Sequence, residues 1–354
     1  MKKVFITTSL AVSSIASGFS RGDTLFPVQH FKTLPHISIR ALEVLNDSTA
    51  WFAANHGTWG YTENAGITWH IDSIKADSVY PEFRSIAVLN DSTALLLSIA
   101  SPAYLFKTTN KGKTWRLVYK NTHKGIFFDS MKFMDHKTGM AVADPIDGHF
   151  YLIASLDGGE NWHAVDSTKI FNSLAKEGES FFASSNTNIA YSPRKFWLAT
   201  GGKYARVIIG GSGGPRSNFL MYDTPMTQGG KMTGIFSIDF LNDTLGVIAG
   251  GDYEKTDRSV VGLAITKDGG KTWKATESNI PFFGSCVRFR SANEFFVTGH
   301  DGTFACNFKT GKTEEVKDRS NAQLKFHTLR FSPSGRTVWL AGGKGMIARI
   351  SFRK

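Results

Sequence analysis

The chain has 354 residues, of which 41% are hydrophobic and 13% aromatic, and 35 of them are glycine. This composition suffices for a large buried core and is typical of many short strands joined by turns, which argues against a helical protein. The formal charge of +11 favours acidic partners, although a basic surface that serves only solubility explains it equally well.

The first predicted element is an N-terminal leader. Met1, Lys2 and Lys3 precede a mildly apolar, uncharged run over residues 4–15, and small residues follow at 16–18. This order is typical of a secretory signal peptide over residues 1–20, although a disordered cytosolic leader fits the same residues. We therefore expect a periplasmic or extracellular protein. No later stretch approaches the ~18 apolar residues of a membrane span, so we expect no transmembrane segment.

One eight-residue phrase occurs four times after the leader. Its copies are TENAGITW at 62–69, TTNKGKTW at 108–115, SLDGGENW at 155–162 and TKDGGKTW at 266–273. The first three copies start at residues 62, 108 and 155, so the intervals are 46 and 47 residues. Such a period is typical of four-stranded propeller blades. The last copy follows after 111 residues, about two intervals, which indicates that one copy has decayed.

The chemistry of the phrase predicts a tight turn that leads into a strand. Its third residue has a short polar side chain that can bond to nearby backbone N–H groups, and its fifth is a glycine that can adopt positive φ. The tryptophan at its eighth position is expected to point into the apolar layer between neighbouring blades. These structural positions are Asn64, Gly66, Trp69, Asn110, Gly112, Trp115, Asp157, Gly159, Trp162, Asp268, Gly270 and Trp273.

Alternating strands that end in Asn-Asp or Ser-Gly turns mark the start of each unit. The starts near residues 39, 83, 127, 180, 234, 284 and 326 predict an all-β propeller of seven four-stranded antiparallel blades over residues 25–354. The fourth unit is assigned strands at 180–186, 195–202 and 204–210, with 222–225 in place of the turn phrase. The seventh unit has only three strands, so segment 28–34 is expected to supply the fourth and close the ring.

The two cysteines are expected to remain unpaired. Cys286 falls on the first strand of its unit and Cys306 on the third, which places them about two strand spacings, or roughly 9.5 Å, apart. A disulfide requires Cα atoms within about 7 Å of each other. We therefore predict two buried thiols.

Arginines recur where the innermost strands begin. Arg40 and Arg84 occupy the same position in neighbouring units, and Arg288 and Arg330 lie three residues further along their own strands. We interpret these four arginines as a basic ligand-binding funnel on one rim of the central channel, shared with Asp129 and Glu179. Because the chain shows no nucleic-acid-binding motif, the expected partner is a protein or an anionic glycan.

The four turn phrases follow the S/T-x-D/N-x-G-x-T/N-W pattern of the Asp-box, or BNR, repeat. The single-domain, seven-blade plan resembles the photosystem II stability/assembly factor-like family, and more distantly the sialidase and sortilin-type propellers. The phrases at 143–148, 182–187 and 199–202 are similar to those of exported members of the first family. The resemblance implies a propeller fold with the box at the blade periphery, and a monomeric, non-enzymatic, assembly-factor-like binding protein.

A glycoside hydrolase is the alternative function. Such an enzyme needs two carboxylates about 5–9.5 Å apart, and Asp129 and Glu179 are the weak catalytic candidates. Glu179 precedes an unusually polar stretch, 184–187, which is either a degenerate strand or one that faces a ligand. A sialidase is disfavoured because Phe83-Arg84-Ser85-Ile86 lacks the proline of that family's arginine motif and because seven blades, rather than six, are predicted. No metal or cofactor motif occurs, and the glycines at 210–214 lack the Lys-Ser/Thr of a phosphate loop.

Overall fold

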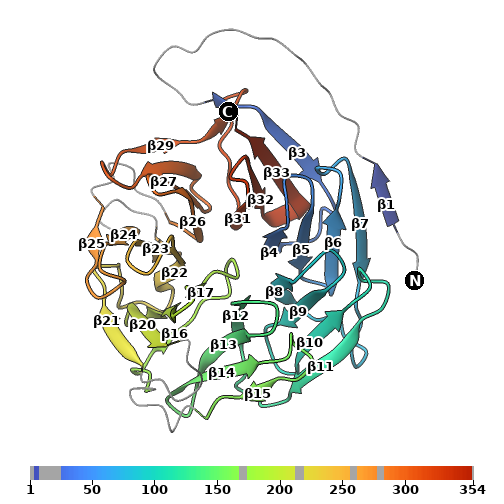
Figure 1. The fold of residues 1–354 in the computed structure, drawn as a ribbon, viewed down its shortest axis with the longest axis horizontal. Coiled ribbons are helices and arrows are strands. Elements are labelled where there is room, and N and C mark those ends of the chain that lie inside the picture. Colours follow the sequence, from blue (N-terminus) through green and yellow to red (C-terminus); the bar gives the residue numbers. More distant parts are fainter. Residues whose placement is uncertain are drawn as a thin grey trace.

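The computed structural model describes residues 4–7, 25–166, 174–211, 219–255, 261–276 and 283–352. Figure 1 shows that the strands in these ranges form a ring of sheets around a central axis. The sheets make seven four-stranded antiparallel blades, which confirms the predicted all-β propeller. Within the described ranges no helix is long and apolar enough to span a membrane.

Each blade runs from an innermost strand to an outer one. Blade 1 consists of β4 (Ile39–Val44), β5 (Ala50–Ala54), β6 (Thr58–Thr62) and β7 (Thr68–Ser73). Blade 2 consists of β8 (Phe83–Val88), β9 (Ala94–Ser98), β10 (Ala103–Thr108) and β11 (Arg116–Asn121). Blade 3 consists of β12 (Phe128–Phe133), β13 (Gly139–Ile146), β14 (His149–Ser155) and β15 (His163–Ala164). Blade 4 consists of β17 (Ile189–Tyr191), β18 (Lys195–Ala199), β20 (Arg206–Gly211) and β21 (Leu220–Asp223). Blade 5 consists of β22 (Thr233–Phe240), β23 (Gly246–Asp252), β24 (Leu263–Thr266) and β25 (Lys274–Ala275). Blade 6 consists of β26 (Cys286–Ser291), β27 (Glu294–Thr298), β28 (Thr303–Asn307) and β29 (Thr313–Glu315). Blade 7 consists of β31 (Thr328–Phe331), β32 (Thr337–Ala341), β33 (Met346–Ser351) and β3 (Val28–Lys32).

The hydrophobic core lies between the blades. Middle strands such as β5 and β9 are buried along their whole length because a neighbouring blade covers each face. The tryptophans of the turn phrases pack in these layers, as predicted. Trp69 meets Trp339 of blade 7 edge-on at 6.0 Å between ring centroids, and Trp115 meets Trp59 of blade 1 in the same way at 5.0 Å. Trp162 and Trp273 also join clusters that link their blades to the preceding one.

The turn phrases share one hydrogen-bond pattern. In the first copy Asn64 Oδ1 accepts a bond from the Thr68 N–H at 2.9 Å, and Gly66 takes a positive φ of 86°. The Gly66 N–H donates to Thr62 Oγ1 at 3.0 Å, a contact that the sequence interpretation missed. Equivalent bonds recur in the other three copies. The hydroxyl at the first position of the phrase thus stabilises the turn together with the Asn or Asp.

The N-terminal strand closes the ring, as predicted. β3 pairs antiparallel with β33, from Val28 opposite Ile350 to Lys32 opposite Met346. Its Phe31 is buried in the layer between blades 7 and 1. Upstream, β2 (Leu25–Phe26) pairs in parallel with β30 (Lys317–Asp318), and β1 (Val4–Thr7) lies along β7. The rest of the predicted leader, residues 1–20, lies outside the described residues.

Both cysteines are buried and free, which confirms the predicted thiols. Cys286 lies on β26, the innermost strand of blade 6, and Cys306 lies on β28, the third strand. Burial raises the pKa of the Cys306 thiol to about 12, so this thiol is protonated at neutral pH.

The predicted strands of the fourth unit are partly wrong. The innermost strand of blade 4 is β17 (Ile189–Tyr191), whereas the prediction placed it at 180–186. Only β16 (Glu179–Ser180) is a strand there, and it pairs with β19 (Gly201–Gly202), which belongs to the neighbouring sheet. Tyr222 and Asp223, assigned to a turn, lie in the outer strand β21. Residues 212–218, between β20 and β21, lie outside the described residues.

Candidate functional site

The polar segment of the fourth unit, residues 183–187, fills the middle of the channel, and we call it the plug. Figure 1 shows the chain reaching into the centre of the ring before it enters β17. Asn186 is 2% exposed; its Oδ1 accepts a bond from the Met131 N–H and its Nδ2 donates to Ile86 O, both at 2.9 Å. The Thr328 hydroxyl donates to Ser185 O at 3.2 Å. Because such polar residues cannot pack between two apolar blade layers, they bond to the innermost strands instead.

The plug, which belongs to the fourth unit, contacts the innermost part of all six remaining blades. Ser185 Oγ donates to Ser285 O of blade 6, and Thr187 Oγ1 donates to Ser237 Oγ of blade 5 at 2.7 Å. Arginines of blades 1, 2 and 7 donate to plug carbonyls. The stretch that the sequence presented as a degenerate or ligand-facing strand is therefore a buried tie between blades.

Four innermost strands share a β-bulge at their start. The ladders of β4, β8, β12 and β22 each skip one residue at this point. The inserted residues are Arg40, Arg84, Asp129 and Phe236. A bulge turns the inserted side chain away from the regular alternation, so these four side chains leave the blade layers at one level of the channel.

Arg40 and Arg84 form the basic part of the channel mouth. Arg84 makes an ion pair of 2.7 Å with Glu82, and its Nη1 donates to Ala183 O at 3.3 Å. Arg40 Nη1 donates to Ser184 O at 3.4 Å. Burial and then the charge of Arg84 lower the pKa of Arg40, and an interaction with Tyr253 partly opposes this shift. Their bonds to the plug carbonyls are long, and among the described residues only Arg84 has a carboxylate within ion-pair distance.

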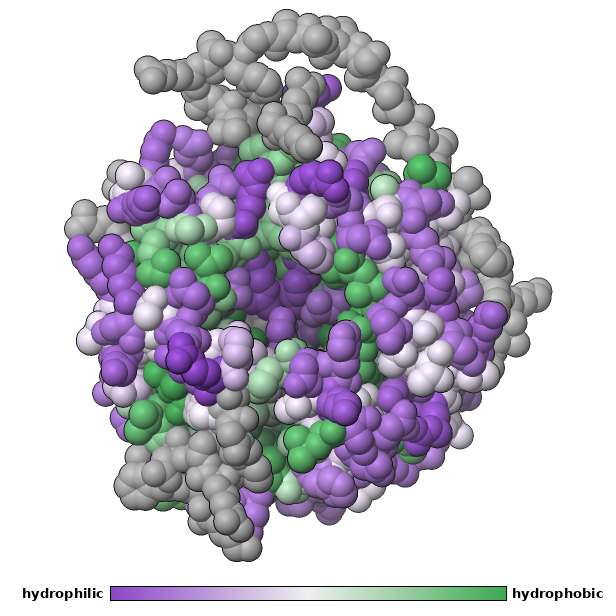
Figure 2. All heavy atoms as spheres, viewed as in Figure 1, coloured by the Kyte–Doolittle hydropathy of each residue, from purple (hydrophilic) through white to green (hydrophobic). Residues whose placement is uncertain are grey.

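His327 and a group of aromatic rings border the same mouth. Burial, followed by the charge of Arg40, lowers the pKa of His327 to about 4, so its ring is neutral at neutral pH. Tyr253 is 42% exposed and packs edge-on against Phe283 and His300 at 5.3 and 5.4 Å between ring centroids. Figure 2 shows that the centre of the ring is hollowed and that hydrophilic residues gather there.

Arg288 and Arg330 lie deeper in the channel than the mouth arginines. Arg288 pairs with Asp239 at 3.3 Å, and Arg330 pairs with Glu43 at 3.5 Å. Arg330 also donates to Asn186 O at 3.1 Å. Both side chains are at most 9% exposed. The four predicted ligand-binding arginines therefore form two groups, of which only Arg40 and Arg84 face the mouth.

Asp129 and Asp144 form a second charged feature beside the mouth. Asp129 has no exposed surface, and neither of its oxygens accepts a hydrogen bond of normal geometry from the described residues. Burial, and then the charge of Asp144, raise the pKa of Asp129 far above its usual range; Arg84 and the backbone N–H groups of Ala183 and Asp144 only partly oppose this. Burial also raises the pKa of Asp144 to about 6.

Glu179 lies in a buried ion pair. Its side chain is 0% exposed and contacts Arg206 at 2.5 Å. The Thr200 hydroxyl and the Lys176 N–H donate to the same carboxylate at 2.6 and 3.0 Å. Neither predicted catalytic carboxylate, Asp129 or Glu179, is exposed to a ligand. No cluster of three or more His, Cys, Asp or Glu side chains suitable for a metal ion occurs among the described residues.

The comparisons with known proteins agree on the fold. No protein-family model and no curated protein matches the chain. Among solved structures, "YCF48 bound to D1 peptide" superposes with a TM-score of 0.65 at 14% identity, covering 92% of this chain and 97% of that one. YCF48 from Cyanidioschyzon merolae gives 0.67 at 12% identity, covering 92% and 99%. The WD40 repeats of RRP9 give 0.64 at 14% identity, covering 92% and 98%. These likenesses show a seven-bladed propeller like that of YCF48, a photosystem II assembly factor.

Sequence reasoning identified Arg40, Arg84 and Asp129 at the mouth but overlooked three of its members. Asp144 was considered as part of the family-like phrase at 143–148 and as one of several possible carboxylates of a glycoside hydrolase, but not as part of the mouth, while His327 was seen only as the start of a unit and Tyr253 was not singled out. The one available signal was the position of these residues at the ends of strands. His327 directly precedes β31 and Tyr253 directly follows β23, so both lie where the channel-facing loops begin.

Proposed function

We propose that this protein is a non-enzymatic binding propeller that captures a negatively charged segment of a protein partner at the channel mouth. The observation that carries the proposal is the adjacency of Arg40 and Arg84, of which only Arg84 has a carboxylate of the described residues, Glu82, within ion-pair distance, while both guanidinium groups make long bonds to plug carbonyls. A carboxylate from a partner would replace these weak contacts with shorter, charge-assisted ones. Supporting this, a structural relative is described as YCF48 bound to D1 peptide.

Two further parts of the proposal, the assembly-factor-like role and the export of the protein, rest on the sequence. The Asp-box phrases and the single-domain plan support an assembly-factor-like role, and the basic leader at residues 1–20 supports export to the periplasm or beyond. N-terminal sequencing of the mature protein tests export, and a mature protein that still begins at Met1 contradicts it. An anionic glycan is the alternative ligand at the same arginines.

Charge reversal at the mouth tests the proposed function. The double variant Arg40→Glu, Arg84→Glu is expected to bind a fluorescent hexaglutamate peptide at least tenfold more weakly than the parent, since a charge-assisted hydrogen bond contributes about 1.5–3 kcal/mol. The control is Lys113→Glu, Lys271→Glu, which changes net charge equally at two exposed residues of the turn phrases. Fluorescence anisotropy measures both affinities.

Equal losses in the two double variants would show that only net charge matters and would refute the mouth as the site. The same titration with a heparin hexasaccharide in place of the peptide measures binding of an anionic glycan. Binding of this glycan through Arg40 and Arg84, with no binding of the peptide, would favour the glycan alternative.

A further inference from the structure

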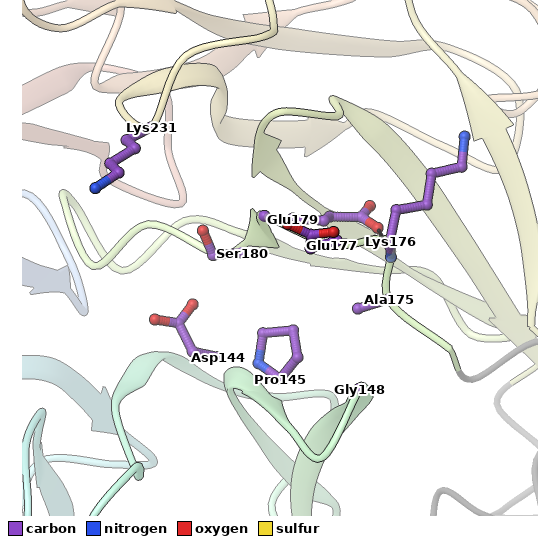
Figure 3. Close-up of a pocket in the computed structure, with 10 residues that line it drawn as sticks. Asp144, Pro145, Gly148, Ala175, Lys176, Glu177, Glu179, Ser180 and Lys231 are labelled. Atoms are coloured by element: carbon purple, nitrogen blue, oxygen red, sulfur yellow. Dashed lines mark hydrogen bonds between the residues drawn. The ribbon is translucent and has the colours of Figure 1, made fainter.

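A pocket of about 490 Å³ lies beside the channel mouth. It is bounded by the hairpin of β13 and β14 on one side and by the chain that leads through β16 to the plug on the other. Figure 3 shows the Asp144 carboxylate and the Ser180 hydroxyl on one side of this space, with Lys231 approaching from another element. Its volume lies within the range of about 300–1,000 Å³ that is typical of ligand pockets.

Most charges around the pocket are already balanced. Glu179 is paired with Arg206, and the exposed Glu177 lies 3.3 Å from Lys203. Lys176 lies 3.9 Å from Asp223, and its ammonium also lies over the ring of Tyr204 at 4.5 Å. These groups therefore do not favour either sign of ligand.

Two of the described lining charges lack such a partner, the exposed Lys231 and Asp144. Asp144 accepts one hydrogen bond, from the Phe181 N–H at 3.0 Å, and no described cation lies within ion-pair distance of it. Near it lies Asp129, which is fully buried and accepts no hydrogen bond of normal geometry from the described residues. Burial and the charge of Asp144 disfavour the ionised form of Asp129, and Arg84, which partly opposes this, is already paired with Glu82. A carboxylate that is partly buried without a cation partner is unfavourable for the folded protein, so a cation that enters the pocket gains the attraction of Asp144.

We propose that this pocket is a subsite for a cationic side chain, lysine or arginine, of the bound protein segment. The proposal rests on the proposed function only for the identity of the molecule that carries the cation, because the preference for a cation comes from Asp144 itself. A metal ion is a poorer fit, since no group of three metal-ligating side chains occurs in the described part of the chain. The mouth and the pocket together would select a segment that carries an acidic group and a basic side chain.

The test uses the full chain and two isosteric probes, Nα-acetyl-arginine methylamide and its uncharged counterpart Nα-acetyl-citrulline methylamide. Titrations followed by the amide NMR signals of Gly148 and Gly178, both of which line the pocket, measure binding. We expect saturable shifts with the arginine probe and none with the citrulline probe. Asp144→Asn should weaken binding at least tenfold, whereas the matched control Glu177→Gln, which changes a paired and exposed carboxylate, should alter it less than twofold.

Two further measurements distinguish binding at Asp144 from nonspecific binding of the arginine probe elsewhere on the protein. Arginine binding should weaken as the pH falls through about 6, because protonation removes the charge of Asp144. The groups that face this carboxyl are Asp129, Glu177, Glu179, Lys176 and Lys231, with Arg84 behind Asp129. Lys231→Met should strengthen binding, since it removes the exposed cation that competes at the pocket edge.

Equal binding of the arginine and citrulline probes, or unchanged binding in a folded Asp144→Asn variant, would overturn the proposal. The variant Arg40→Glu, Arg84→Glu keeps the two questions apart. Suppose that this variant still binds the arginine probe and also binds hexaglutamate as well as the parent does. The proposed function would then fail, while the cation subsite would stand. Arginine binding that requires the two mouth arginines would mean that the pocket has no cation site of its own.

Discussion

The turn phrases at the periphery and the plug at the centre use the same side chain in opposite ways. Asn64 is exposed, and its hydrogen bonds reach no further than four residues along the chain, to Thr68. Asn186 is buried and bonds to strands 55 and 100 residues away, in blades 3 and 2. The comparison teaches that the polar side chains of the repeat stabilise turns within one blade, whereas the polar side chains of the plug connect several blades.

The largest expected effect comes from removing the strand that closes the ring. Deletion of residues 24–36 takes away β3 and exposes the edge of β33, so the unfolding midpoint should fall more than for any substitution below. Loss of the buried Phe31 alone should cost about 3–5 kcal/mol. Thermal and urea unfolding measure both, and Phe31→Ala is the milder companion if the deletion does not fold. An unchanged midpoint would contradict this closure.

The second prediction compares the two asparagines directly. Asn186→Ala leaves the Met131 N–H and Ile86 O buried without partners and should lower the free energy of unfolding by about 3 kcal/mol. Asn64→Ala exposes its partners to water and should cost about 1 kcal/mol. Urea titrations of the two variants provide the measurement. If both losses are equal, the plug does not hold the blades together more strongly than a surface turn does.

The smallest expected difference concerns two glycines with similar positive φ, Gly112 at 76° and Gly311 at 72°. A Cβ at Gly112 would lie 2.0 Å from the Trp59 ring, whereas a Cβ at Gly311 would meet nothing within 4 Å. Gly311→Ala should therefore show only the backbone cost of about 1 kcal/mol, and Gly112→Ala about 2 kcal/mol more from overpacking. Similar unfolding midpoints for the two would show that the turn phrase does not rely on packing against the preceding blade.

The arginines show where prediction from the sequence reaches its limit. Arg40 and Arg84 were correctly grouped because they hold equivalent positions in two repeats, and the structure places both in bulges at the start of their strands. Arg288 and Arg330 were assigned to the same funnel, although three residues along a strand place them at another depth, where Asp239 and Glu43 pair with them. The repeat gave the angular position of each side chain around the axis but not its partners.

The sequence by itself determined the number of blades, the turn chemistry, the buried tryptophans and the closing strand, because these depend on alternation and on a regular period within about 50 residues. Only the tertiary structure decided the path of the plug, the burial of Glu179 against Arg206, and the meeting of Asp129 with Asp144. These features rest on contacts between blades, where polar groups excluded from water bond to whatever partner the closed ring brings near. No local pattern specifies that partner, so the contacts made by the residues of the channel mouth became visible only in the folded chain.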